Sequence, residues 1–347
     1  MLSEVIKVFI LSTIAFVLAI LLTPLLTRFL YKYKLGKQIR DTESAPIFSA
    51  LHAKKSGTPT MGGLLIWVTT AILAALFFYL SKLPHLEIFK SLNFLSRPQT
   101  LLPLGVLIAS GLVGAFDDYL NVRKIGPKGG GLKMYHRILI YTFIAIVGAW
   151  WFYSKLQWEV IHIPFFGDFH IGLWYIPLFI FVIIATSFSV NETDGLDGLA
   201  GGILLIAFAA YGIIAFAQGR FDLACFCGVI IGTLIAFLWF NIYPARFIMG
   251  DTGAMSLGVT LGVIAMITNE FILLPIIGLI LIIESMSVII QLISKKVRHK
   301  KIFLSTPIHH HFEAIGWPEA QIVMRFWLIN GVGAMLGLII FLAEKMF

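Results

Sequence analysis

Residues 191–218 read NETDGLDGLAGGILLIAFAAYGIIAFAQ, a polar and acidic run that leads directly into a long apolar segment. Residues 198–218 contain no charged side chain. A helix needs about 20 apolar residues to cross the ~30 Å hydrocarbon core of a bilayer. The stretch therefore predicts a transmembrane helix with carboxylates at its edge. Because a charged group near hydrocarbon is costly, such carboxylates indicate a functional site.

The composition extends this pattern to the whole chain of 347 residues. Hydrophobic residues make up 59% and charged residues 13%, whereas soluble domains carry about 25% charged residues. We therefore expect an all-α polytopic membrane protein forming a single integral membrane domain over residues 1–347, with no nucleic acid among its partners. Ten transmembrane helices are predicted, at residues 6–30, 59–80, 100–120, 134–154, 173–190, 198–218, 221–241, 253–268, 270–294 and 322–343.

Two segments depart from a simple bundle of helices. Pro275 falls within the first turns of the ninth span and predicts that this helix is broken or kinked. Between Trp158 and Ile171, two short β-rich runs flank Gly167-Asp168, which predicts a small extracytoplasmic β-hairpin.

The basic residues predict the orientation of the bundle. When the 26 lysines and arginines are assigned to alternating loops, most of them fall on one side, which the positive-inside rule places in the cytoplasm. Every acidic and histidine cluster falls on that same side. With an even number of spans, both termini are then extracytoplasmic and the site faces the cytosol. The basic end of the ninth span is expected to lie towards anionic headgroups.

Asp117 and Asp118 come at the end of the third span. Adjacent helical residues point about 100° apart, so the two carboxylates are expected to have different roles. A solvated helix end is the simpler interpretation. Negative charge is disfavoured at a helix C-terminus, however, which favours a functional role for the pair.

Asn191, Asp194 and Asp197 recur every three residues, which places them on one face if the segment is helical. Gly195 and Gly198 remove side chains from the intervening backbone, as close approach of a ligand would require. Three oxygen-bearing groups suit a hard cation, or donors such as ribose hydroxyls and an imide N–H. Helix caps in a turn are the alternative, but they would not account for all three residues.

Three further motifs border apolar runs. Asp251 precedes the eighth span and is either an N-cap or a candidate magnesium ligand. His309, His310 and His311 are consecutive, which is the wrong spacing for a helical zinc pair. They are expected either to face a pyrophosphate or to form a polar loop. Glycines and hydroxyls follow Lys55 at the start of the second span and form a plausible, weakly specific anion site.

Together these motifs resemble one family, phospho-N-acetylmuramoyl-pentapeptide transferase, of the polyprenyl-phosphate N-acetylhexosamine-1-phosphate transferase superfamily. The resemblance covers nearly the whole chain. The aspartate motifs are those of the superfamily, whereas the histidine loop and residues 58–63 resemble the muramoyl branch. The residues that carry the resemblance are Asp117-Asp118, residues 191–198, residues 241–251, residues 55–63 and residues 307–313.

The resemblance implies transfer of phospho-N-acetylmuramoyl-pentapeptide from UDP-MurNAc-pentapeptide to undecaprenyl phosphate, giving lipid I and UMP. This is the first membrane step of peptidoglycan synthesis, and the family uses Mg²⁺. The resemblance also implies a multi-pass protein of the bacterial inner (cytoplasmic) membrane and a homodimer.

Motif position implies the role of each site residue. Asp251 corresponds to a magnesium ligand, and Asp117, supported by Asp118, to the candidate base for the lipid phosphate. The histidines His309, His310 and His311 are assigned to the catalytic site. The residues assigned to substrate binding are Lys55, Thr60, Asn191, Asp194, Asp197, Asn241 and Gln291.

The chain departs from the family pattern at two positions. Asn121 stands where the family usually has a lysine, three residues after the aspartate pair. Ile248 stands where it usually has a phenylalanine that stacks on uracil, with Phe247 beside it. The glycines at 129–131 lengthen the following basic loop and leave Arg137 as the match for another family lysine.

Two other functions are compatible with the sequence. A sister enzyme would transfer a different UDP-N-acetylhexosamine phosphate to the same lipid. An ion-coupled transporter also has carboxylates within its spans, but here the acids gather towards one face of the membrane and no repeated half is visible. Phosphoryl transfer instead needs both reactants positioned at the cytoplasmic interface and their charge neutralised.

Overall fold

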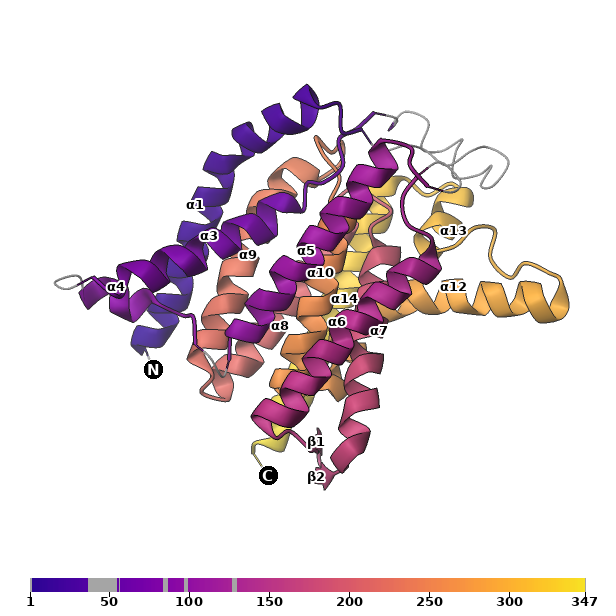
Figure 1. The fold of residues 1–347 in the computed structure, drawn as a ribbon. Helices are drawn as coiled ribbons and strands as arrows, with labels where there is room; N and C mark the ends of the chain where they lie inside the picture. Colours follow the sequence, from indigo (N-terminus) through magenta and orange to yellow (C-terminus); the bar gives the residue numbers. More distant parts are fainter. Residues whose placement is uncertain are drawn as a thin grey trace.

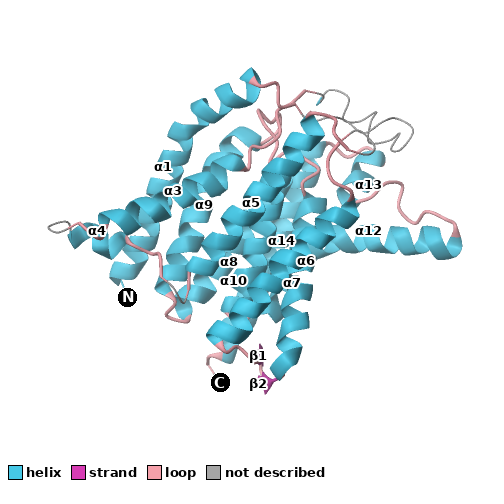
Figure 2. Ribbon diagram, viewed as in Figure 1, coloured by secondary structure: helices cyan, strands magenta, loops and turns pink. Residues whose placement is uncertain are grey.

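The computed structural model describes residues 2–36, 55, 57–83, 87–96, 99–126 and 130–346, so the predicted positions Ser56 and Gly129 lie outside the described residues. Helices make up almost all of its secondary structure (Figure 2). The α-helices are α1 (Leu2–Lys32), α3 (Leu64–Leu80), α4 (Glu87–Leu92), α5 (Leu101–Val122), α6 (Met134–Trp150), α7 (Tyr175–Thr193), α8 (Leu199–Ala217), α9 (Phe221–Asn241), α10 (Gly250–Ile267), α11 (Leu274–Ile277), α12 (Leu279–Arg298), α13 (Ile308–Ala314) and α14 (Glu319–Glu344).

The predicted polytopic helical fold is confirmed. Among the described residues, eight helices are long and apolar enough to cross a membrane, and a bent pair of helices makes up to nine. The chain is therefore a multi-pass membrane protein. The second predicted span is the exception, because α3 has 17 residues and is shorter than the other candidates.

The second span is shorter than predicted because residues 59–63 are not helical. Met61 has a positive φ of 69°. The backbone N–H groups of Gly62 and Gly63 donate to the carbonyls of Ile248 and Met249, at 2.8 Å each. These residues therefore pair with the segment that leads into α10, and the glycine run forms part of the site rather than of a helix.

The ninth span is broken, as predicted, but not at the proline. Residues 271–277 and α12 meet at an angle of 84°. The break falls at Gly278, three residues after Pro275, which lies in the first turn of α11, where a proline is tolerated. From this break α12 projects sideways out of the bundle (Figure 1).

The predicted hairpin is present, with its turn earlier than expected. Strand β1 (Val160–Ile163) pairs antiparallel with β2 (Gly167–His170), so Gly167 and Asp168 begin the second strand instead of forming the turn. Residues 164–166 form the turn, and Phe165 has a φ of 65°. His162 of β1 lies 2.9 Å from a carboxylate oxygen of Glu344, which fastens the hairpin to the end of α14.

The two ends of the bundle differ in character. Both chain termini and the hairpin lie at one end, whereas α13 and the described residues 57–63, 130–133 and 242–249 lie at the other (Figure 1). Helix α10 runs through the centre and packs against α5 and α7. Its Gly258 lies against Ser187 and its Gly262 against Thr186, so small residues allow the helices to approach closely. This packing brings the first turn of α10 between the ends of α5 and α7.

Candidate active site

The two adjacent aspartates of α5 are both buried and point to different neighbours. Asp117 is fully buried and accepts a hydrogen bond from the backbone N–H of Leu132 at 2.6 Å. Asp118 accepts hydrogen bonds from the N–H of Thr252 at 3.0 Å and from the hydroxyl of Thr60 at 3.1 Å. Asp118 therefore holds the start of α10 and residue 60 in place, while Asp117 faces the neighbouring helix α6.

Arg137, in the first turn of α6, connects three site residues. Its Nε lies 2.8 Å from Oδ2 of Asp117, and one terminal nitrogen lies 2.8 Å from Oδ2 of Asp251. The other terminal nitrogen donates to the side-chain oxygen of Asn191 at 3.1 Å. Asn191 in turn donates to Oδ1 of Asp251 at 2.6 Å. We call Asp117, Arg137, Asn191 and Asp251 the arginine cluster.

The arginine cluster depends on a guanidinium at residue 137. A planar guanidinium presents donors in several fixed directions, which a lysine does not. The resemblance in the sequence gave Arg137 only as the match for a family lysine. It did not indicate that Arg137 lies at the centre of the site. Its position one turn into a helix that follows the acidic pair was the available signal.

Asp194 and Gly250 fix the approach to Asp251. Helix α7 ends at Thr193, and Asp194 accepts a hydrogen bond from the N–H of Gly250 at 3.0 Å. Gly250 has a φ of 75°, and a Cβ there would lie 2.6 Å from a carboxylate oxygen of Asp118. Only glycine fits this position, because any side chain would displace Asp118.

The prediction that Asn191, Asp194 and Asp197 share one helical face is wrong. Only Asn191 is helical, because α7 ends at Thr193 and α8 begins at Leu199. The turn between them sends the three side chains to different partners. Asn191 joins the arginine cluster, Asp194 holds Gly250, and Asp197 belongs to a second polar group.

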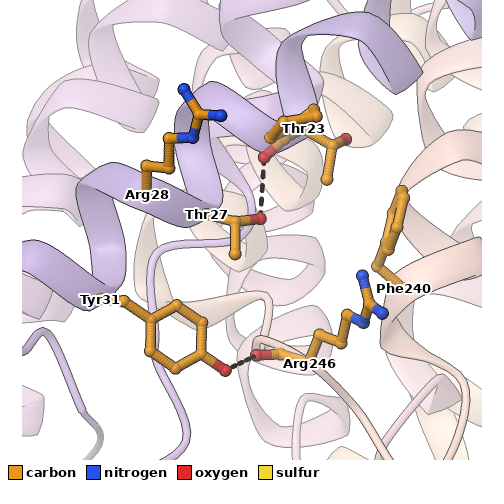
Figure 3. A pocket seen from close by; sticks show the side chains of 7 residues that line it. Thr23, Thr27, Arg28, Tyr31, Phe240 and Arg246 are labelled. Atoms are coloured by element: carbon orange, nitrogen blue, oxygen red, sulfur yellow. Dashed lines mark hydrogen bonds between the residues drawn. The ribbon is translucent and has the colours of Figure 1, made fainter.

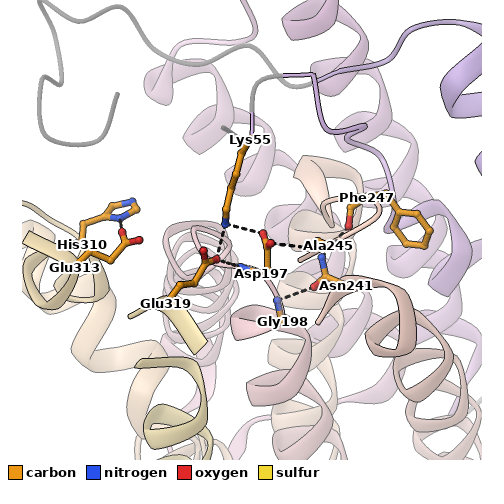
Figure 4. Close-up of polar contacts among 9 residues, drawn as sticks. All are labelled: Lys55, Asp197, Gly198, Asn241, Ala245, Phe247, His310, Glu313 and Glu319. Atoms are coloured by element: carbon orange, nitrogen blue, oxygen red, sulfur yellow. Dashed lines mark hydrogen bonds and ion pairs between the residues drawn. The ribbon is translucent and has the colours of Figure 1, made fainter. Parts of the chain in front are cut away.

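This second group gathers around Lys55 (Figure 4). The Lys55 ammonium lies 2.7 Å from Oδ1 of Asp197 and also contacts the carboxylate of Glu319, the first residue of α14. The same Glu319 oxygen accepts the backbone N–H of Asp197 at 2.7 Å, and Oδ2 of Asp197 accepts the N–H of Ala245 at 3.0 Å. We call Lys55, Asp197, Ala245 and Glu319 the lysine cluster.

The electrostatics of the lysine cluster keep Lys55 charged. Burial lowers the pKa of Lys55, but the carboxylates of Glu319 and Asp197 more than offset burial, so the pKa is raised above its usual value. Glu319 was not predicted from the sequence, since an acidic residue at a helix start resembles an ordinary helix N-terminus.

Asn241 and Phe247 shape the loop beside the lysine cluster (Figure 4). Asn241 accepts the N–H of Gly198 at 3.0 Å and donates to the carbonyl of Phe247 at 2.8 Å. The side-chain oxygen and nitrogen of Asn241 are therefore both bonded to backbone groups of the protein. The Phe247 ring is fully buried between Phe237 and Phe240. It therefore cannot replace the uracil-stacking phenylalanine that the family usually has at the position of Ile248.

The three consecutive histidines point to three different places. His309 is fully buried, with its Nδ1 2.9 Å from a carboxylate oxygen of Glu284, which is also fully buried. His310 lies 2.6 Å from Glu313. The Nδ1 of His311 accepts the backbone N–H of Leu304 at 3.3 Å. They do not form one anion-binding row.

His309 reaches the site through a glycine. A Cβ on Gly195 would lie 2.1 Å from Nε2 of His309, so this nitrogen packs directly on the turn that carries Asp194. The predicted substrate ligand Gln291 is placed differently. Its amide accepts the N–H groups of Ile302 and Phe303 and donates to the carbonyl of Phe303, so it holds the loop after α12.

The acidic residues can be compared with what Mg²⁺ requires. In the described part of the chain, no group of three or more histidine, cysteine, aspartate or glutamate side chains is arranged to hold a metal ion by itself. Mg²⁺ usually takes only one or two carboxylates, with substrate phosphates completing its coordination. Oδ2 of Asp117 is buried and lies 2.8 Å from Nε of Arg137, its ion-pair partner. Asp117 and Asp251 therefore have the right chemistry for such a site.

Comparison with known proteins defines the class of this chain. Residues 100–269 match the model of glycosyl transferase family 4. These residues contain both aspartates of α5, Arg137, Asn191 and Asp251. This match, together with the helical membrane fold, places the chain in the class of integral membrane glycosyl transferases. Residues 55–66, which include Lys55 and Thr60, match signature 1 of phospho-N-acetylmuramoyl-pentapeptide-transferase.

Several curated proteins of that name are similar along most of their length. The protein of Chloroflexus aggregans is 38% identical over 97% of this chain and 90% of its own. Those of Geobacillus sp. (strain WCH70) and Bacillus anthracis are each 39% identical over 94% of this chain and 95% of their own. The chain belongs to the phospho-N-acetylmuramoyl-pentapeptide-transferase family. The resemblance seen in the sequence is confirmed, and with it a phosphoglycosyl transferase of the kind that makes lipid I in peptidoglycan synthesis.

Proposed function

We propose that this chain transfers phospho-N-acetylmuramoyl-pentapeptide from UDP-MurNAc-pentapeptide to undecaprenyl phosphate, releasing UMP and forming lipid I. Family membership supports this proposal. The observation that carries it is the arginine cluster, in which carboxylates of α5 and α10 and an amide of α7 meet one guanidinium at a single end of the bundle. A polar site at this level can receive a reactant from water and another from the bilayer.

The acceptor lipid has a suitable apolar groove beside this site. A cavity of about 410 Å³ lies between α7 and the broken helix formed by α11 and α12. Val182 and Leu281 belong to its apolar walls, and Ser189 lines it two residues before Asn191 of the arginine cluster. An isoprenoid chain in this groove would place its phosphate towards Asn191 and Asp251.

We assign the nucleotide end of the donor to the lysine cluster and the turn between α7 and α8. Lys55 and the two carboxylates that hold it offer an N–H donor and oxygen acceptors, which suit the hydroxyls and imide of a uridine. Asp197 and Glu319 hold Lys55 and that turn in one arrangement. Preorganised groups of this kind contribute to transfer because they fix the position of the reacting phosphate.

We assign charge neutralisation at the reacting phosphate to the arginine cluster. Arg137, whose three nitrogens contact Asp117, Asn191 and Asp251, places a fixed positive charge beside the reacting phosphate. Asp251 would hold Mg²⁺, which when bound would neutralise charge on the transferring group. We assign the proton-accepting role at the lipid phosphate to Asp117, whose carboxylate lies at the same guanidinium as Asp251.

We further propose that the protein lies in the bacterial cytoplasmic membrane with this site on the cytoplasmic face and both termini outside. The excess of lysine and arginine at the site end supports this orientation. A homodimer is proposed from the family alone.

A substrate assay tests the proposed function. Purified protein in detergent should release UMP from UDP-MurNAc-pentapeptide only when undecaprenyl phosphate and Mg²⁺ are both present. UDP-N-acetylglucosamine should react far more slowly, because remote groups of the donor supply binding energy that is used at the reacting phosphate. Equal turnover of the two donors would indicate the sister enzyme. Uptake into sealed vesicles without UMP release would indicate a transporter.

A substitution in the lysine cluster separates binding from chemistry. Asp197→Ala removes one carboxylate from Lys55 and the acceptor of the Ala245 N–H. We expect the KM for the UDP donor to rise about tenfold or more, with a smaller change in kcat, because charged hydrogen bonds are worth about 1.5–3 kcal/mol. Asp197→Asn keeps an acceptor for Ala245 and should lose less. A fall in kcat at unchanged KM would contradict the assignment to nucleotide binding.

A further inference from the structure

A second groove lies outside the proposed transfer site, at the end of α1 and α9 (Figure 3). It has a volume of about 400 Å³. Arg28 of α1 lies on one side, and Phe240 of α9 and Arg246 lie on the other. Pro24 and the Phe240 ring supply apolar wall, so two positive charges border a largely hydrophobic hollow.

This groove lies at the level of the membrane interface. Helix α1 has 31 residues and, at 1.5 Å per residue, is about 46 Å long, whereas the hydrocarbon core is about 30 Å thick. Arg28 lies in the last two turns of α1, beyond the length that hydrocarbon requires. Aromatic side chains that mark an interface surround this level and are well exposed, namely Tyr31, Tyr33, Trp239 and Tyr243.

The charge of the groove favours an anion. Among the described residues, neither Arg28 nor Arg246 lies within ion-pair distance of a carboxylate. Helices α1 and α9 run parallel, since Gly228 lies against Val8 and Gly232 against Ser12. Both C-termini therefore lie here, each with about half a negative charge, and the two guanidinium groups leave a net positive site. Guanidinium forks match phosphate oxygens.

We propose that this groove binds the phosphate headgroup of an anionic glycerophospholipid from the surrounding bilayer. The headgroup lies between Arg28 and Arg246, and an acyl chain follows the apolar surface of α1 past Pro24. The groove is separate from the acceptor groove, because α1 and α12 lie on opposite sides of the bundle (Figure 1). The proposal therefore does not depend on the transfer reaction.

A lipid bound here would also hold a loop of the transfer site. The Tyr31 hydroxyl donates to the backbone carbonyl of Arg246 at 3.4 Å, which joins α1 to the loop 242–249. That loop supplies the N–H of Ala245 to Asp197 and the carbonyl of Phe247 to Asn241. Occupation of the groove is therefore expected to stabilise the folded protein.

Native mass spectrometry tests the proposal. Purified protein in detergent is titrated with phosphatidylglycerol or with phosphatidylcholine, and the fraction that carries one lipid is measured. We expect phosphatidylglycerol to bind at least tenfold more tightly than phosphatidylcholine, and the doubly substituted protein Arg28→Gln/Arg246→Gln to lose that preference. Arg28→Lys/Arg246→Lys should retain part of it, because charge remains but the fork is lost. A thermal unfolding scan checks that each variant is folded.

The matched control is Arg123→Gln/Arg325→Gln, which removes two exposed arginines that lie over the rings of Tyr119 and Trp317. It should keep the preference for phosphatidylglycerol. An equal loss in this control would overturn the proposal, since general surface charge would then explain binding. Displacement of phosphatidylglycerol by one equivalent of undecaprenyl phosphate would also overturn it and make the groove an acceptor site.

Discussion

Replacing Asp251 by asparagine is expected to lower turnover by about 100-fold or more. Asp251 joins Arg137 and Asn191 at the start of α10, and its charge is the one that we assign to magnesium. Asparagine keeps the shape and most hydrogen bonds but removes that charge, so neutralisation at the transferring group is lost. The rate of UMP release at saturating donor, acceptor and Mg²⁺ measures the effect.

Asp222→Asn is the matched control for this substitution. Asp222 also lies in the first turn of a membrane-spanning helix, α9, and pairs with a basic residue, Lys7, at 3.6 Å. Its substitution should leave turnover near the unmodified value. If Asp251→Asn released UMP at a near-normal rate at any Mg²⁺ concentration, the assignment of Asp251 to the reacting site would be wrong.

Replacing Arg137 by glutamine is expected to reduce stability as well as activity. Asp117 is fully buried, and the Asp251 side chain is only 15% exposed. Removing their common positive partner leaves both carboxylates uncompensated, which costs about 3–5 kcal/mol for a buried pair. Thermal unfolding in detergent should show the loss. Arg137→Lys should recover much of the stability but little of the turnover, because lysine cannot reach three partners at once.

Arg123→Gln serves as the control for Arg137. Arg123 is exposed at the end of α5, and its loss should change stability by no more than about 0.5 kcal/mol. If Arg137→Gln were as stable and active as this control, the arginine cluster would have no role in either property.

The helical membrane fold could be predicted because apolar length alone determines it. Segments such as residues 198–218 have few alternatives in a membrane, where backbone polar groups must be satisfied internally. The limits of the helices were less predictable. Residues 59–63 carry no charge and were counted in the second span, yet their backbone pairs with residues 248 and 249. Such a contact between distant segments leaves no periodic signal in the sequence.

The site residues were easier to identify than their arrangement. Asp117, Asn191 and Asp251 could be selected because each is polar at the end of an apolar run. Their meeting around Arg137 depends on helix packing. The three histidines show the opposite case, because adjacency in sequence suggested a common role whereas the helical backbone of α13 turns their rings towards different neighbours.

Glu319 could not have been selected from its surroundings in the sequence. It follows Pro318 at the start of α14, where an acidic residue is favoured by the helix dipole in any protein. Its contact with Lys55 crosses 264 positions of the chain. Only the folded structure shows that it belongs to the lysine cluster.

The most direct measurement of the central assignment is binding of Mn²⁺, a magnesium substitute detectable by electron paramagnetic resonance, to purified protein with UDP-MurNAc-pentapeptide. We expect one bound Mn²⁺ with coupling to donor phosphorus. Asp251→Asn should weaken its binding at least tenfold, and Asp222→Asn should leave it unchanged. Equally tight binding and unchanged phosphorus coupling in Asp251→Asn would contradict the account.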